Sequence, residues 1–316
     1  MPFGMPTMLD LAKAKDNDTT IGLIEENIAV MPEFNLFPSR QISKTSYRTI
    51  IRTGYPTAAF RSANSGQRRS KSAFENRMTE CFIIDTPIAA DKQVADAWEP
   101  GGAPEYQSIE SEGVLIATSR RVATQIYYGN SAVSVAAGLG DAKGFPGLVD
   151  AYDATGHSVN AGGSTALTSV WAVKLGIKDV HLVFGGDSVL TLLPQWRIET
   201  AYDASGNPYT AYMNNLAGWI GLNVSTILTV VRIYNIGTDA NKGMTDALGQ
   251  AAMELFPAQV FPDYFIMNRR SRRQLKNSRV QVSTGQGWNA NSVPLPSDIE
   301  GIPILITDAL SNAETF

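Results

Sequence analysis

The sequence predicts an α+β protein from whose body one long two-stranded β-ribbon extends. Residues 44–85 hold two runs rich in β-branched and aromatic residues around a polar, turn-forming stretch, which is typical of a ribbon with a loop at its tip. Residues 104–128 carry one apolar stripe at three- and four-residue steps, which predicts a long helix. Short strands over residues 168–236, then mixed helices and strands over residues 237–316, predict an antiparallel sheet followed by an α/β lobe.

The composition excludes several classes of protein. The 316 residues are 44% hydrophobic and 18% charged, and 30 acidic against 26 basic residues exclude an overall basic nucleic-acid coat. Because no run of about 18 apolar residues occurs, we expect no membrane span. The N-terminus lacks the basic-then-apolar layout of a signal peptide. One cysteine, Cys81, excludes an intramolecular disulfide framework and a Cys-rich metal site. We therefore expect a soluble, intracellular chain.

Signatures of catalysis are missing from the sequence. The two histidines, His157 and His181, lie in different segments, whereas zinc and iron sites use imidazoles at close spacing. Neither the nucleophile elbow G-x-S-x-G nor a P-loop occurs. We therefore expect no catalytic residue, no cofactor and no metal ion. A hydrolase with a carboxylate pair remains a minor alternative, because such carboxylates are paired in space and not in the chain.

The first 43 residues predict an arm tied down on another structure. Thr7 is positioned to cap one short helix, and Thr20 a second that ends before Pro32. An extended stretch with Phe34, Leu36 and Phe37 is expected to follow. Scattered apolar anchors without a core of their own are typical of an arm that docks elsewhere.

The ribbon of residues 44–85 is expected to reach beyond its own subunit. Its limbs, residues 47–60 and 74–84, flank a polar tip at residues 61–72. A limb of about 12 to 15 residues spans roughly 40 to 50 Å. A compact domain of 316 residues has a radius of gyration of about 20 Å. Because an isolated two-stranded hairpin is marginal in water, a neighbouring copy is the simplest support.

Charge separates sharply along this part of the chain. Residues 44–77 carry eight basic residues against one acid, and residues 85–112 carry seven acids against one lysine. Opposite stripes suit head-to-tail contacts between identical chains, in which complementarity sets the register. The alternative is that both stripes are simply solvated. The expected interface residues are Arg48, Arg52, Arg61, Arg68, Arg69, Lys71, Arg77, Asp91, Asp96, Glu99, Glu105, Glu110 and Glu112.

The middle of the chain predicts a helix of about 37 Å, a Gly-rich crossover and a sheet. The crossover covers residues 129–167, and Trp171, Trp196 and Trp219 are expected to pack the face of the sheet. The expected strands are residues 170–174, 180–184, 197–202, 209–213 and 224–234.

The last part of the chain contains a basic cluster in its α/β pattern. Helices are expected at residues 244–256 and 271–277, and strands at residues 264–267 and 302–307. The cluster comprises Arg269, Arg270, Arg272, Arg273, Lys276 and Arg279. Clustered cations favour phosphate contacts. However, no aromatic is interleaved for base stacking. We therefore favour a subunit or polyanion contact over sequence-specific binding of nucleic acid.

Several stretches together resemble the major capsid proteins of tailed bacteriophages with the HK97-type fold. They are SYRTIIRTGYPTAAFRSANSG, SKSAFENRMTECF, IYYGNSAVSVAAGLGDAKGFPGL, SVWAVKLGIKDVHLVFG, PDYFIMNRRSRRQLKNSR and GIPILITD. The resemblance covers nearly the whole chain. Two departures stand out: the chain ends soon after Thr307, where the namesake of the fold adds further strands, and no Lys–Asn crosslinking pair can be matched.

The resemblance implies a domain assignment. Residues 1–43 form the N-terminal arm, 44–85 the extended E-loop, 86–128 the entry and spine helix of the peripheral (P) domain, 129–167 the crossover between domains, 168–236 the sheet of the P domain, and 237–316 the axial (A) domain.

The resemblance also implies a function. It predicts a structural protein that assembles with itself into hexamers and pentamers of an icosahedral shell around phage double-stranded DNA, in the host bacterial cytoplasm and finally in the virion. Scaffolding, portal and decoration proteins and non-specific contact with DNA are expected partners, and no membrane is. The alternatives are an encapsulin-like compartment and a nucleic-acid-binding protein that uses the basic cluster at residues 269–279.

Overall fold

The computed structural model describes residues 31–99, 101–151, 157–186, 190–192, 195–283 and 294–315. The helices expected after Thr7 and Thr20 lie outside these residues. The first described element is the short helix α2 (Glu33–Leu36), which replaces the extended stretch expected there. Pro32 precedes this helix with a helical backbone conformation, and the buried ring of Phe37 anchors its end in the core.

The first sheet is built around one long strand. Strand β10 pairs antiparallel with β4 along one edge and with β7, β8 and β9 along the other, and β7 pairs in parallel with β1. Its strands are β1 (Ser39–Gln41), β4 (Phe82–Asp91), β7 (Val180–Gly185), β8 (Thr191–Leu192), β9 (Arg197–Tyr202) and β10 (Pro208–Val224). The strand expected at residues 209–213 is thus much longer, and Gly218 and Gly221 within it permit close contacts with neighbouring segments.

The second sheet contains strands from distant parts of the chain. Its order is β13 (Asp298–Ile299), β14 (Ile302–Ile306), β12 (Tyr264–Met267), β6 (Thr168–Val173), β11 (Val230–Ile236) and β5 (Ser158–Asn160). The single sheet expected over residues 168–236 is therefore wrong, because β6 and β11 pair with each other in the second sheet, where β6 also pairs with β12. Every residue of β6 is buried. A strand buried on both faces shows no alternation that would tell which sheet it joins.

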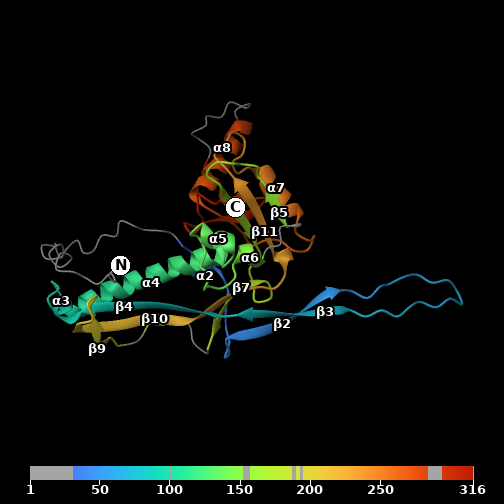
Figure 1. Cartoon of the computed structure of the whole chain (residues 1–316). Helices are drawn as coiled ribbons and strands as arrows, with labels where there is room; N and C mark the ends of the chain where they lie inside the picture. Colours follow the sequence, from blue (N-terminus) through green and yellow to red (C-terminus); the bar gives the residue numbers. More distant parts are fainter. Residues whose placement is uncertain are drawn as a thin grey trace.

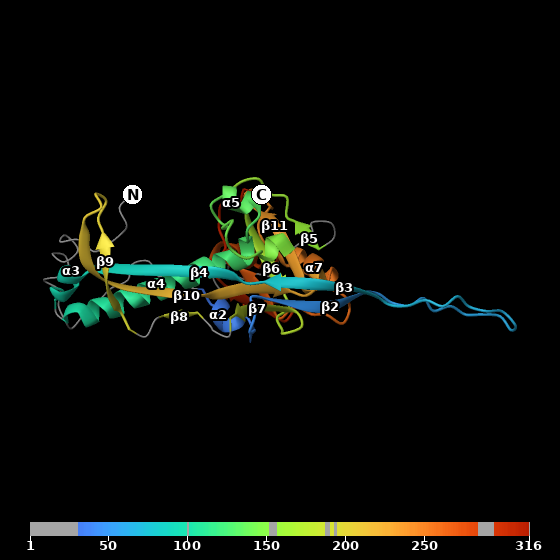
Figure 2. The ribbon, with the colours of Figure 1, turned by 60° about the horizontal axis from the view of Figure 1, so that its bottom comes forward.

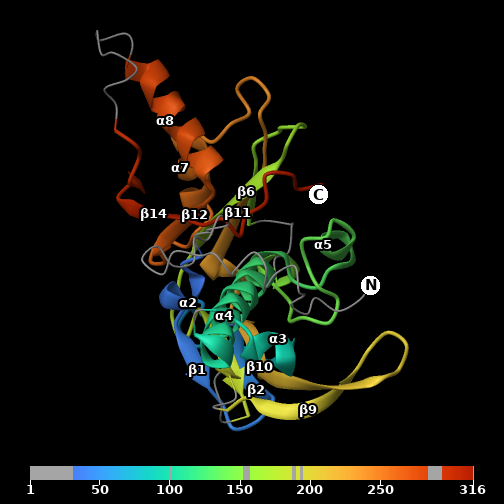
Figure 3. The same cartoon turned by 90° about the vertical axis from the view of Figure 1, so that its left-hand side faces the viewer.

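Strand β6 contributes to two hydrophobic cores. Trp171 and Val173 pack in the core shared with the first sheet and α4 (Gly102–Tyr128), whereas Val170 and Ala172 pack in a core with α7 (Asp246–Glu254) and α8 (Arg269–Ser283). Figure 3 shows the second sheet between α4 on one side and α7 and α8 on the other. Trp171 thus packs on the second sheet, and Trp196 and Trp219 are only half-buried.

The expected long helix is confirmed as α4, which has 27 residues and a length of about 40 Å. It lies along β4 and β10 (Figures 1 and 2). Its C-terminal half is buried through Val122, Ile126 and Tyr127. A short helix precedes it and three short helical segments come later in the chain: α3 (Lys92–Asp96), α5 (Ala132–Ala136), α6 (Leu148–Ala151) and the 3-10 turn η1 (Ile227–Thr229).

The ribbon consists of β2 (Ser46–Gly54), β3 (Ala73–Glu80) and the connection between them, residues 55–72. It projects far beyond the body of the molecule, as expected (Figures 1 and 2). Each paired limb ends earlier than predicted, the first at Gly54 instead of residue 60 and the second at Glu80 instead of residue 84. Pro56 has no N–H to donate to the ladder, and residues 82–84 belong to β4.

Candidate assembly interface

The root of the ribbon is fixed to the first sheet by polar contacts. The hydroxyl of Tyr47 lies 3.0 Å from Nε2 of buried His181. Thr79 donates a hydrogen bond of 2.8 Å to Asn223. Arg77 donates to the carbonyl oxygens of Val224 and Ser225 at 2.9 and 3.1 Å. These contacts lie on one face of the ribbon and set the direction in which it leaves the body.

Two glycines allow the root to approach the sheet closely. A Cβ atom on Gly221 would lie 2.5 Å from the carbonyl oxygen of Glu80, and one on Gly185 would lie 3.0 Å from the carbonyl oxygen of Lys44. Both neighbours are backbone atoms that cannot rotate away. Glycine at these positions therefore permits the backbone of the ribbon to cross the sheet.

The opposite face of the ribbon is unusually apolar for an exposed surface. Arg48 pairs with Met78, Ile50 with Asn76 and Arg52 with Phe74, so these side chains share one face. Ile50 is 73% exposed, and Phe74 and Met78 are also exposed. The Arg52 guanidinium lies 5.4 Å from the ring centroid of Phe74. Contiguous exposed apolar side chains of this kind mark interaction sites.

The basic residues predicted for the interface lie where a partner can reach them. All seven are exposed, and the four of the connection, Arg61, Arg68, Arg69 and Lys71, gather toward the tip. One local contact is Arg61 to the carbonyl oxygen of Ser65 at 3.0 Å. Arg77 differs from the other six, because its guanidinium donates to the carbonyl oxygen of Val224 at the root of the ribbon.

The predicted acidic residues lie at the other end of the molecule, at the end of β4, in α3, in the turn after α3 and in the first half of α4 (Figure 1). Some of them have local roles. Asp91 caps α3 by accepting from the backbone of Gln93 at 2.8 Å. Asp96 forms an ion pair with Lys92 and accepts from Tyr212 at 3.0 Å, and these hydrogen bonds lower its pKa. Glu99 and Glu112 are exposed, and Glu105 and Glu110 are half-buried.

The basic cluster on α8 is largely used inside its own lobe. Arg279 forms a bidentate ion pair with Asp246 at 2.7 and 2.8 Å. Arg270 donates to the carbonyl oxygens of Ala166 and Asn312, and Arg272 to that of Pro296. Arg269 lies 3.9 Å from Asp308. Arg273 is exposed, Lys276 is half-buried, and Leu275 faces inward as predicted.

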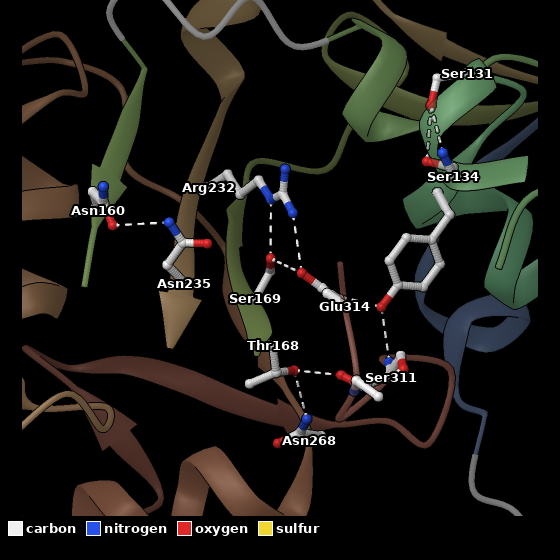
Figure 4. Close-up of polar contacts among 12 residues, drawn as sticks. Ser131, Ser134, Asn160, Thr168, Ser169, Arg232, Asn235, Asn268, Ser311 and Glu314 are labelled. Carbon is white, nitrogen blue, oxygen red and sulfur yellow. Dashed lines mark hydrogen bonds and ion pairs between the residues drawn. The ribbon is translucent and has the colours of Figure 1, made fainter. Parts of the chain in front are cut away.

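A buried polar network joins the C-terminal segment to α4 and to the second sheet (Figure 4). Glu314 accepts from Tyr128 of α4 at 2.8 Å and from Ser169 of β6 at 2.6 Å, and it pairs with Arg232 of β11 at 3.1 Å. The side chains of Arg232 and Glu314 are only 9% and 1% exposed. Burial, and then the charge of Glu314, raises the pKa of Tyr128 well above its ordinary value.

Sequence reasoning missed this network. Its one signal was an arginine inside the apolar run VVRIY, because a buried charge requires a partner. The partner, Glu314, lies 82 residues away in the chain, so the sequence alone could not identify it.

A second buried carboxylate, Glu33, joins α2 to α4 and to the residue after β14. One oxygen accepts from Tyr127 at 2.9 Å and from Thr307, and among the described residues the other has no hydrogen-bond partner. Burial raises the pKa of Glu33 against the lowering effect of these donors, and the nearby charge of Asp308 raises it further.

We expect Glu33→Gln to change the dependence of stability on pH. A raised native pKa means that the contribution of Glu33 is complete below its unfolded pKa and is lost as pH rises through the native value. Glutamine keeps the shape and cannot ionise. The free energy of unfolding of the variant should therefore gain on that of the wild type from acidic to neutral pH, as measured by urea titrations. A constant difference across pH would contradict a raised pKa of Glu33.

The part of the chain that the structure describes has a small cavity but no cluster of metal-ligating side chains. It contains no group of three His, Cys, Asp or Glu side chains placed to hold a metal ion. In the same residues no helix is long and apolar enough to cross a membrane. A cavity of about 90 Å³ lies between α4 and β4, beside the ion pair of Arg121 and Asp141 at 3.0 Å. Binding sites for small organic ligands are several times larger, about 300 Å³ or more.

Comparisons with known proteins agree with this arrangement. A family model described as major capsid protein GP7 matches residues 16–316. No curated protein matches the chain. A chain in the structure of bacteriophage Epsilon15 superposes with a TM-score of 0.71 at 19% identity, covering 98% of this chain and 96% of that one. The capsid of bacteriophage JBD30 superposes with a TM-score of 0.54 at 11% identity, covering 95% and 97%.

The structural matches show the HK97-type fold, and the family match is to a capsid protein, which favours a phage capsid over an encapsulin-like compartment. The chain belongs to the major capsid protein GP7 family, whose members form the protein shell of tailed bacteriophages.

Proposed function

We propose that copies of this capsid protein join head to tail, with the ribbon of one copy lying against the acidic end of the next. Repetition of this contact around a ring gives hexameric and pentameric capsomers, and the capsomers close into an icosahedral shell around double-stranded DNA. Scaffolding, portal and decoration proteins are further proposed partners. Assembly takes place in the cytoplasm of the host bacterium.

The single observation that carries the proposal is the separation of the two charged surfaces. The ribbon with its exposed basic residues projects from one end of the molecule, and the acidic residues of α3 and α4 lie at the other (Figure 1). The two surfaces cannot meet within one chain. Complementary patches at opposite ends generate heterologous contacts, which close into rings when the rotation between copies permits.

The exposed apolar face of the ribbon supplies affinity in this arrangement. Burial of Ile50, Phe74 and Met78 against a neighbour removes apolar surface from water, and each side chain contributes up to about 1.5 to 3 kcal/mol when fully buried. The charges then set the register. Contacts repeated around each copy strengthen one another, because release requires several to break together.

The structure also suggests the domains of the shell subunit. The proposal assigns the first sheet and α4 to the P domain, the second sheet with α7 and α8 to the A domain at the centre of the capsomer, and the ribbon to the E-loop. The exposed Arg273 of α8 is the cation of the basic cluster best placed for a further contact, with DNA or with a neighbouring copy.

Reversing charge at the tip of the ribbon tests the proposal. We expect Arg68→Glu combined with Arg69→Glu to raise several-fold the protein concentration at which shells form in 0.1 M salt. The difference should shrink in 1 M salt, because the Debye length falls from about 10 Å to about 3 Å. Sedimentation velocity and negative-stain microscopy measure the protein concentration required for shell formation at each salt concentration.

Lys143→Glu is the matched control, since Lys143 is also exposed but lies far from the ribbon tip, in the segment after α5. It should assemble as the wild type does. Equal shell yields for the tip variant and the wild type at both salt concentrations would contradict the proposed contact.

A further inference from the structure

The hairpin of β9 and β10 carries exposed apolar side chains at the end of the molecule opposite to the ribbon (Figures 1 and 2). Ile198 is 58% exposed and Tyr202 is 68% exposed, although both belong to the paired strand β9. Alternate side chains of a strand point to the same side. Ile198 and Tyr202 therefore share one face of the hairpin, with Thr200 between them.

The register of the two strands defines the neighbours of these side chains. Ile198 lies directly opposite Tyr212, and Tyr202 lies directly opposite Pro208. Directly opposed residues have Cβ atoms about 4.5 to 5.5 Å apart, and alternate residues of one strand are roughly 7 Å apart. One contiguous surface, which we call the hairpin face, therefore consists of Ile198, Thr200, Tyr202, Pro208, Thr210 and Tyr212.

The hairpin face continues a side of the first sheet that is covered elsewhere. Tyr212 is also directly opposite Ala90 of β4, and both pack with Tyr106 of α4. Ala90 is fully buried there. Strand β9 lies on the other edge of β10, beyond this cover, so the side that forms a core on β4 is exposed to water on β9. Contiguous exposed apolar side chains of this kind mark an interaction surface.

Acidic side chains border the hairpin face. The hydroxyl of Tyr212 donates to Asp96 of α3 at 3.0 Å. Glu99 is exposed in the turn that follows α3. The ammonium group of Lys92 pairs with Asp96 and lies 5.6 Å from the ring centroid of Tyr212. Two carboxylates and one ammonium group leave this border with a net negative charge.

The exposed face of the ribbon has the complementary pattern. Its apolar surface comes from Ile50, Phe74 and Met78. Arg48 and Arg52 are exposed on the same face and carry positive charge. The ribbon and the hairpin face lie at opposite ends of the chain, so one copy cannot join its own two surfaces (Figures 1 and 2). A contact between them therefore requires a second copy.

We propose that the hairpin face receives the ribbon of a second copy of this chain. The apolar faces of the two hairpins pack against each other, and the arginines of the ribbon lie beside the carboxylates of α3 and of the turn after it. The inference rests on the proposed function and deepens it, because it names the surface at the acidic end on which the ribbon lies. Packed β-sheet faces lie about 10 Å apart, a layer that large apolar side chains fill.

Crosslinking between copies tests the geometry. Full-length chains with Ile50→Cys and with Ile198→Cys are assembled together, and a short bismaleimide then bridges thiols across the layer between packed faces. The native Cys81 is buried. We expect a crosslinked dimer in the mixed shells and none in shells of either variant alone. Glu199→Cys is the matched control, because Glu199 is exposed on the other side of the same strand, and it should give no dimer with Ile50→Cys.

Two further substitutions test the contribution of the hairpin face to affinity. Ile198→Ser and Tyr202→Ser should each raise the protein concentration required for shell formation about tenfold, because each removes a large apolar side chain from the contact. The increase should be the same in 0.1 M and 1 M salt, since salt screens charges and not apolar contacts. Glu199→Ser is the matched control and should assemble as the wild type does.

The outcomes separate the inference from the proposed function. If charge reversal at the ribbon tip impairs assembly while both serine variants assemble normally and no crosslink forms, only the hairpin face is overturned. A crosslink from Ile50→Cys to Glu112→Cys on α4, and not to Ile198→Cys, would also overturn it and would place the ribbon along α4. If neither set of variants changes assembly, or if the wild-type chain forms no shells, the head-to-tail contact fails and the inference fails with it.

Discussion

Arg232→Ala should lower the free energy of unfolding by about 3 to 5 kcal/mol, the range measured when one partner of a buried ion pair is removed. The substitution leaves the carboxylate of Glu314, which is 1% exposed, without its cation. It also removes the hydrogen bond from Nε to Ser169 at 3.0 Å and the contact with the ring of Trp171 at 5.4 Å. Urea titration followed by circular dichroism measures the loss.

The double variant Arg232→Met with Glu314→Leu separates loss of charge balance from loss of packing. Removing both charges leaves no uncompensated ion, so the double variant should recover much of the stability that the single variant loses. A single variant that unfolds at the wild-type urea concentration would show that the pair does not hold the C-terminal segment in place.

Gly221→Ala should disrupt the root of the ribbon and abolish shell formation. The new Cβ would lie 2.5 Å from the carbonyl oxygen of Glu80 and 3.4 Å from Cα of Cys81, and both are backbone atoms. The strand must shift, which costs about 1 to 3 kcal/mol for overpacking of this kind. The shift displaces the hydrogen bond from the N–H of Cys81 to Thr45, now 2.8 Å long, so the ribbon leaves the body in another direction.

The measurement for Gly221→Ala compares stability with assembly. We expect assembly to be lost to a greater extent than the loss of folding stability explains. The substitution mainly changes the direction in which the ribbon leaves the body and destabilises the fold less. Gly113→Ala is the control, since nothing lies within 4 Å of its added Cβ on α4. It should stabilise the helix by about 0.5 to 1 kcal/mol. Normal shells from Gly221→Ala would refute the role of close approach at the root.

The elements that sequence reasoning placed well are those with a long, uninterrupted pattern. Helix α4 ends at its expected last residue and begins two residues before its expected start at Pro104, and strands β9 and β12 match their expected bounds. The ribbon was predictable because two β-rich runs flank a turn-forming stretch without competing signals. The division of strands between the two sheets was not predictable. The sequence TSVWAV of β6 is suited to burial on both faces and does not indicate which sheet the strand joins.

For the candidate interface, composition gave the two charged stripes but not the role of each charge. Asp91 proved to be a helix cap, and Arg279 proved to pair with Asp246 within its own lobe. Both roles depend on which groups the fold brings together. Gly221 permits two backbones to cross. Such close contacts arise from tertiary structure, which local patterns do not encode.

The sharing of β6 between two cores has a mechanical consequence. The backbone of β6 carries Trp171 and Val173 into one core and Val170 and Ala172 into the other. A torque applied to the elements around one core is therefore transmitted through β6 to the elements around the other core. The body therefore behaves as a stiff lever. In the proposed shell, differences in curvature between pentameric and hexameric positions would then be absorbed by bending of the ribbon and by sliding at the contacts between copies.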